Sequence, residues 1–126
     1  MDGVSRRNGP LSLDVIRITQ YRLGVIQGFR DAATEDIRNG KNTKEARARL
    51  PRDLWRVATR KLDQLHRVLT LDELQIPPGN QLEALKRDRK GQHSIRINDQ
   101  YRICFVWTAD GPEEVVTRRR DRRARR

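Results

Sequence analysis

Two adjacent segments with alternating apolar and polar residues constrain the fold of this chain most strongly. In residues 93–98 and 101–107 nearly every second side chain is apolar. A period of two is typical of a β-strand that buries one face. The set that we expect to face the core comprises Ile95, Ile97, Tyr101, Ile103, Phe105 and Trp107. The two segments therefore predict an antiparallel hairpin with one buried face.

The length of the turn between these strands sets their register. A two-residue turn would place Ile97 opposite Arg102 and mix the two faces. A three-residue turn at residues 98–100 instead pairs Ile97 with Tyr101 and keeps the apolar face intact. We therefore expect the longer turn. It also pairs Arg96 with Arg102 on the face away from the core.

Two arginines directly opposite each other destabilise a sheet unless an anion lies between them. A phosphate would fit, because a guanidinium offers a planar fork of donors that matches phosphate oxygens. A second basic cluster precedes the hairpin and can continue a phosphate track: Lys86, Arg87, Arg89 and Lys90. The alternative is that Arg96 and Arg102 pair with local acids such as Asp88 or Glu83.

The remaining segments predict an α+β fold in which helices cover one face of an antiparallel sheet. Residues 25–29 are typical of a short strand, and residues 31–40 of a helix that Asn39-Gly40 ends. A polar linker follows. Pro51 then begins the clearest helix, with apolar positions at Leu54, Ala58, Leu62, Leu65 and Leu69. Residues 71–74 predict one more helical turn, 76–80 a loop, and 81–85 and 113–117 two further strands.

The charge is concentrated at the C-terminus. The 126 residues carry a formal net charge of +11, to which the nine residues 118–126 contribute +6 with seven Arg and one Asp. Such a net charge indicates a polyanionic partner, and nucleic acid is the first candidate. We expect residues 118–126 to be a disordered Arg-rich tail, 25–117 the folded domain and 1–24 a weakly structured extension.

Composition excludes several classes of protein. The single cysteine, Cys104, can form neither an internal disulfide nor a thiolate zinc site. The longest apolar run has five residues, far below the roughly 18 that span a membrane. The N-terminus lacks the pattern of a secretory signal. We therefore expect a cytoplasmic protein with no membrane association, no metal and no cofactor.

The segments RKLDQL, LDEL and IPPGNQLEALKRDRKGQHSIRINDQYRICFVW closely resemble the HigB-type killer toxins of the RelE/ParE toxin-antitoxin superfamily. The resemblance covers about residues 25–107. It implies a small RelE-like domain, with two helices packed on an antiparallel sheet. It also implies a ribosome-dependent mRNA endonuclease that a helix-turn-helix antitoxin silences, without metal.

The resemblance also implies roles for individual residues. Arg102 matches the catalytic arginine, which would stabilise the charge on the attacked phosphate, and Arg96 and Lys86 match basic positions that orient the backbone. Arg87, Arg89 and Lys90 would bind RNA phosphates. The family usually ends its last strand with Asp-Tyr-His, whereas Val115-Val116-Thr117 runs directly into three arginines here.

The missing motif leaves few acid or base candidates. Glu83 stands where one branch carries His, and it can act as a base. His93 is a second weak candidate, although strand parity favours packing on the core side unless a bulge re-aims it. We expect His66 to lie on the surface and Cys104 to fill space in the core. Two alternatives to an active endonuclease remain: an inactive relative that binds antitoxin or RNA, and a gyrase-targeting toxin of the ParE branch.

Overall fold

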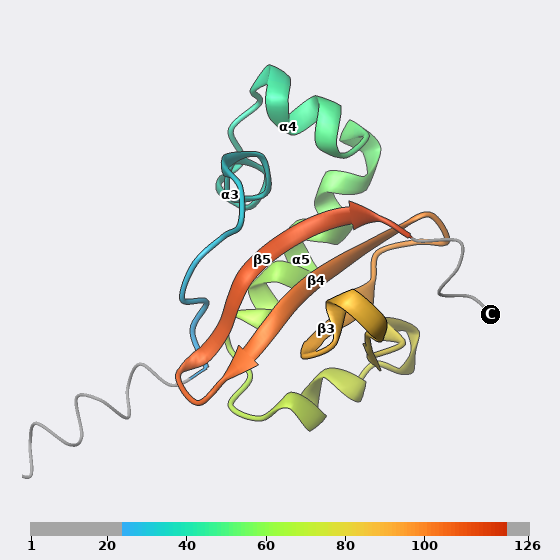
Figure 1. The fold of residues 1–126 in the computed structure, drawn as a ribbon. Coiled ribbons are helices and arrows are strands. Elements are labelled where there is room, and N and C mark those ends of the chain that lie inside the picture. The colour runs from blue at the N-terminus through green and yellow to red at the C-terminus, as the bar shows by residue number, and fades with distance from the viewer. Residues whose placement is uncertain (1–23, 121–126) are drawn as a thin grey trace, which may run out of the picture.

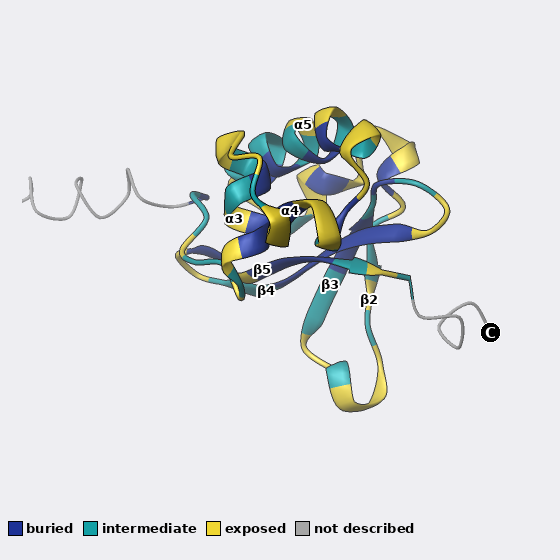
Figure 2. Cartoon of the chain, turned by 90° about the horizontal axis from the view of Figure 1, so that it is seen from above, coloured by how far each residue is buried: buried dark blue, intermediate teal, exposed yellow. Residues whose placement is uncertain are grey.

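A computed structural model describes residues 24–120, which form an antiparallel sheet covered on one face by helices (Figures 1 and 2). The strands follow one another across the sheet in chain order. They are β2 (Glu83–Ala84), β3 (Gln92–Arg96), β4 (Tyr101–Thr108) and β5 (Gly111–Arg119). The expected α+β arrangement and meander are confirmed.

The hairpin of β3 and β4 has the predicted register. Arg96 lies opposite Arg102 and Ile95 opposite Ile103, and the Ile97 N–H donates to the Tyr101 carbonyl at 2.9 Å. The apolar face packs into the core as expected, because Ile95, Ile103 and Phe105 are fully buried. The three-residue turn thus keeps the isoleucines and aromatic side chains of the two strands on one side.

The first described helix, α3 (Ala32–Asn39), begins and ends where the sequence indicates. The Asp31 carboxylate accepts the Thr34 N–H at 2.9 Å, and Gly40 ends the helix with a φ of 74°. The expected polar linker is wrong in part, because it contains a second helix, α4 (Lys44–Arg49). Its start could have been recognised, since the Thr43 hydroxyl caps the Ala46 N–H.

The main core helix is α5 (Trp55–Leu65), preceded by a 3-10 turn, η2 (Arg52–Leu54). Ala58, Leu62 and Leu65 are fully buried, as the spacing predicts. Pro51 precedes η2 and is not the first residue of α5. The expectation for Leu69 is wrong: it lies beyond the helix and is 64% exposed, because the chain turns at His66 and buries Val68 in its place.

Between α5 and the hairpin the chain forms three short 3-10 turns. They are η3 (Leu71–Gln75), η4 (Pro78–Asn80) and η5 (Arg87–Arg89). The expected turn at 71–74 is confirmed, with a capping box in which the Glu73 carboxylate accepts the Thr70 N–H at 3.0 Å. The strand expected at 81–85 is reduced to the two residues of β2.

The strand expected at residues 25–29 is replaced by an extended segment along the edge of β5. It makes a single parallel bridge, from Phe29 to Val115. Backbone hydrogen bonds join Gln27 to Pro112 and Arg30 to Val115. A Cβ on Gly111 would lie 2.2 Å from the Val25 carbonyl oxygen, so this close approach requires glycine.

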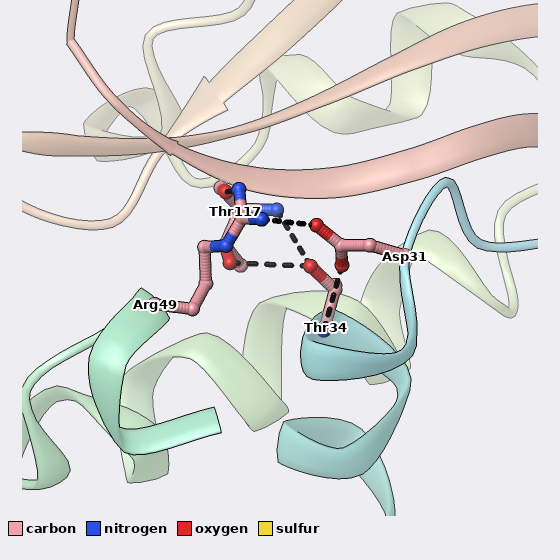
Figure 3. A network of polar contacts seen from close by, with 4 residues as sticks. All are labelled: Asp31, Thr34, Arg49 and Thr117. Atoms are coloured by element: carbon pink, nitrogen blue, oxygen red, sulfur yellow. Dashed lines mark hydrogen bonds and ion pairs between the residues drawn. The ribbon is translucent and has the colours of Figure 1, made fainter. Parts of the chain in front are cut away.

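A polar network covers the same edge nearer the end of β5 (Figure 3). The Thr34 hydroxyl accepts the Thr117 N–H at 3.0 Å, and Arg49 donates to the Thr117 carbonyl at 3.1 Å. Arg49 also pairs with Asp31 at 2.5 Å. On this edge strand, the N–H and the carbonyl of Thr117 are therefore hydrogen-bonded by side chains of α3 and α4.

The last strand is longer than the one expected at residues 113–117. β5 continues through Arg118 to Arg119, because its backbone pairs with β4 as far as Tyr101. The remainder of the expected tail, 121–126, and residues 1–23 of the expected extension lie outside the described residues. In residues 24–120, no helix is long and apolar enough to cross a membrane.

Candidate functional site

Three arginines lie side by side across the face of the sheet that points away from the helices. Arg96 on β3 is directly opposite Arg102 on β4, which is directly opposite Arg118 on β5. The pairing of Arg96 with Arg102 was predicted. Arg118 was assigned to a tail, and it joins the row because β5 extends beyond Thr117. We call Arg96, Arg102 and Arg118 the arginine row.

Arg102 lies at the centre of the row and is buried, with only 4% of its surface exposed. Its guanidinium is contacted on several sides. Its Nε donates to the Ser94 hydroxyl at 2.7 Å, and Nη2 donates to the backbone carbonyls of Gln81 and Ser94. The Glu83 carboxylate lies 3.5 Å from Nε. Burial lowers the pKa of Arg102, and Glu83 acts in the opposite direction. A guanidinium remains protonated in proteins, so the site holds a fixed, buried positive charge.

Local acids accompany two arginines of the row. Arg96 Nη2 lies 2.6 Å from the Asp99 carboxylate in the adjoining turn. Pairing with Asp88 or Glu83 was the expected alternative to a bound anion. Glu83 does pair with Arg102, whereas Arg96 pairs with Asp99 and not with Asp88. Asp99 lies in the turn, three positions after Arg96, which is close enough for the two side chains to pair.

Arg89 extends the positive surface over the middle of the sheet. Its Nη2 donates to the Cys104 sulfur at 3.2 Å. Cys104 is buried, as expected of a packing residue, and burial raises the pKa of its thiol. The positive charges of Arg89, Arg118 and Arg102 each act to lower that pKa.

The other basic residues expected to bind phosphate lie around η5, at the tip of the β2–β3 hairpin. Lys86 and Lys90 flank this turn, and both are exposed, as is Arg87. Arg87 has a φ of 62°. The hairpin thus brings Arg89 onto the sheet and leaves its neighbours open to solvent.

The two histidines lie away from the arginine row. His93 stacks on Phe105 on the core side, with ring centroids 6.2 Å apart, as strand parity predicted. Its Nδ1 is buried without a hydrogen-bond partner among residues 24–120. His66 is half-buried at the end of α5, where its Nδ1 accepts the Ile26 N–H at 3.1 Å. This hydrogen bond joins the N-terminal segment to the helix. His66 was expected on the surface, whereas it is half-buried and has a backbone partner.

Sequence reasoning missed a polar cluster behind the site. The fully buried Asn80 donates to the Leu74 carbonyl at 3.0 Å and to the Gln64 side chain at 3.1 Å. Lys61 on α5 donates to the Asn80 side-chain oxygen at 2.5 Å, and burial lowers the pKa of Lys61. Asn80 immediately precedes Gln81, whose carbonyl accepts from Arg102. An asparagine after Pro-Pro-Gly was the available signal, since a turn residue of this type often bonds nearby backbone.

In the part of the chain that the structure describes, no cluster of three or more His, Cys, Asp or Glu side chains could hold a metal ion. What the site offers chemically is donors and positive charge. Such an arrangement can bind a phosphodiester and stabilise negative charge that develops on it.

Comparison with known proteins decides the family. A family model described as the RelE-like toxin of type II toxin-antitoxin system HigB matches residues 27–118. The chain belongs to this family. The matched range contains the whole arginine row and every described element except the last residue of β5, Arg119.

Two curated proteins are similar to parts of this HigB-like chain. Toxin HigB-1 of Vibrio cholerae is 41% identical over 58 residues, which is 46% of this chain and 61% of the relative. An uncharacterised protein of Haemophilus influenzae is 34% identical over 63 residues, which is 50% of this chain and 62% of the relative. The chain thus matches about three-fifths of the length of these relatives.

Proposed function

We propose that this HigB-like toxin cleaves mRNA on the ribosome. The reaction is attack of a ribose 2′-OH on the adjacent phosphate, which needs a base, an acid for the leaving 5′-oxygen and cations for the charge on phosphorus. The observation that carries the proposal is the arginine row on the face of the sheet that points away from the helices, in a chain of this family.

In this proposal Arg102 stabilises the pentacoordinate phosphorus, because its charge is already desolvated and oriented by Ser94 and Gln81. Arg96 and Lys86 orient the backbone. Arg87, Arg89 and Lys90 bind neighbouring phosphates from the hairpin tip. Glu83 is the candidate base, because it lies beside Arg102.

The proposed partners are the ribosome with its mRNA and a helix-turn-helix antitoxin, in the cytoplasm. Family membership supports an antitoxin partner, since type II toxins are defined together with a neutralising protein. Co-expression with the product of the adjacent gene tests this part by co-purification.

Purified protein added to a translating extract tests the activity, with mRNA 5′ ends mapped by primer extension. We expect new 5′ ends with wild type and none with Arg102→Ala. A matched control is Arg67→Ala, which removes an exposed arginine after α5. Identical cleavage by wild type and Arg102→Ala, or no cleavage in the presence of ribosomes, would refute the proposal.

A second candidate is a catalytically inactive relative that binds antitoxin or RNA. The burial of Arg102 favours it, because Ser94, Gln81 and Glu83 already occupy much of the guanidinium. Both histidines also lie away from this face. The inactive relative predicts a stable antitoxin complex without growth arrest on expression, whereas growth arrest with mapped cleavage eliminates it.

A further inference from the structure

The C-terminal end of β5 presents arginines alternately to the two faces of the sheet. Arg118 lies opposite Arg102, and the Arg120 N–H donates to the Gln100 carbonyl at 2.6 Å, which continues the ladder beyond the strand. Arg119, between them, turns to the other face, where its guanidinium lies 5.6 Å from the Tyr101 ring centroid. By strand parity Arg118 and Arg120 share the face of Arg102.

The positive charge on this face exceeds the negative charge beside it. Arg120 acts to lower the pKa of Arg102, as does Arg96, so both guanidinium groups lie within electrostatic reach. The nearby acids are already engaged, Glu83 by Arg102 and Asp99 by Arg96. Like charges crowded together without an equal number of acids favour binding of an anion.

Two further arginines accompany the arginine row. The Nε atoms of Arg89 and Arg120 are buried and have no acceptor within residues 24–120. These two atoms are covered by protein, but each guanidinium also carries Nη groups that donate in a fixed fork. Arg89 and Arg120 therefore add donors for an anion on this face.

We propose that Arg118 and Arg120, together with Arg89, form an anion subsite beside Arg102 that binds the phosphates of neighbouring nucleotides. Adjacent strands lie about 4.8 Å apart, so the arginine row spans roughly 10 Å, which is wider than one phosphate. The ligand is thus an RNA strand with at least two consecutive phosphates. The choice of RNA as the ligand rests on the proposed function. Binding at this subsite requires no cleavage.

Equilibrium binding of a fluorescein-labelled 2′-O-methyl RNA oligonucleotide tests the subsite, since this probe lacks the attacking hydroxyl. Fluorescence anisotropy over a salt series compares wild type with the double variant R118Q/R120Q. We expect about tenfold weaker binding at low salt, and a slope of log K against log salt that is smaller by about 1.4, for two lost contacts to a single strand.

Two controls separate the subsite from net charge and from stability. The variant R56Q/R60Q removes the same charge from exposed positions of α5. The variant R119Q removes one charge from the same strand but from the opposite face. We expect R56Q/R60Q and R119Q to retain wild-type slopes, and all variants to keep cooperative thermal unfolding.

An unchanged slope in R118Q/R120Q, or an equal loss in R56Q/R60Q, would overturn the subsite. The same proteins are then compared in the translating extract. If wild type binds the probe through Arg118 and Arg120 but cleaves no mRNA, the proposed function fails and the subsite stands. If wild type cleaves mRNA and R118Q/R120Q binds the probe like wild type, the subsite fails and the proposed function stands.

Discussion

Arg102 on β4 donates two hydrogen bonds to Ser94 on β3, one from Nε to the hydroxyl at 2.7 Å and one from Nη2 to the backbone carbonyl at 3.2 Å. Ser94 lies opposite Cys104, so Arg102 reaches diagonally across the two strands. Glu83 lies opposite Ser94 on β2 and approaches the same guanidinium. Three strands thus fix the direction of one positive charge before any ligand binds.

The planar shape of the Arg102 side chain should matter as much as its charge. Arg102→Lys retains the charge but loses the fork that contacts Ser94 and Gln81 together. We expect cleavage in a translating extract to fall by roughly 10²–10³-fold, the cost typical of losing one preorganised donor. Arg67→Lys is the matched control at an exposed position. Wild-type cleavage by Arg102→Lys would show that the guanidinium geometry is not needed.

Asn80 should stabilise the segment that delivers Gln81 to Arg102. Asn80→Ala leaves the Leu74 carbonyl without its donor and Lys61 without its acceptor. We expect the free energy of unfolding in urea to fall by about 1–3 kcal/mol, the usual cost of buried polar groups left unpaired. Gln75→Ala, at an exposed position of η3, is the control. Equal midpoints for wild type and Asn80→Ala would contradict this account.

The Thr34 hydroxyl should stabilise the edge of β5. Thr34→Val retains the shape of the side chain but leaves the buried Thr117 N–H without its acceptor. We expect a loss of about 1–3 kcal/mol in the free energy of unfolding. Thr59→Val is the comparison, because that half-buried hydroxyl makes a long contact, 3.4 Å, to the Ile37 carbonyl. A larger loss in Thr59→Val than in Thr34→Val would refute the prediction.

His66 should make stability depend on pH. Its pKa is lowered from 6.5, first by burial and then by Arg38, while Asp63 acts in the opposite direction. The unfolded chain therefore binds the proton more readily, so this contribution is complete above pH 6.5 and is lost as the pH falls through the folded pKa. Protonation of Nδ1 also removes the acceptor for the Ile26 N–H.

Urea unfolding of wild type and His66→Gln between pH 5.5 and 7.5 checks this prediction. We expect the stability advantage of wild type to shrink toward the acidic end, because the variant has no titrating group at this position. Titration of the His66 ring by NMR should give a pKa below 6.5. An advantage that grows on acidification would show the sign to be wrong.

Much of the fold could be predicted because it follows from local patterns. The alternation in 93–98 and 101–107, with the cost of mixing faces, predicted the register that opposes Arg96 and Arg102. The caps of α3 and the spacing of Ala58, Leu62 and Leu65 were equally local. The helix α4 was missed because only Ala46 of its six residues is buried, so no apolar period marks it.

The sequence by itself determined the hairpin, its register and the pairing of Arg96 with Arg102, because these depend on side-chain alternation within a few residues. Only the tertiary structure decided the rest of the candidate site. Backbone pairing with β4 extended β5 and brought Arg118 into the row, although a run of arginines alone favours an extended, solvated chain. Likewise, the contacts of Arg102 with Gln81 and Glu83 depend on how the segment after α5 packs. Hydrogen bonds between residues far apart in the sequence, such as that from Lys61 to Asn80, position this segment, and no local pattern encodes them.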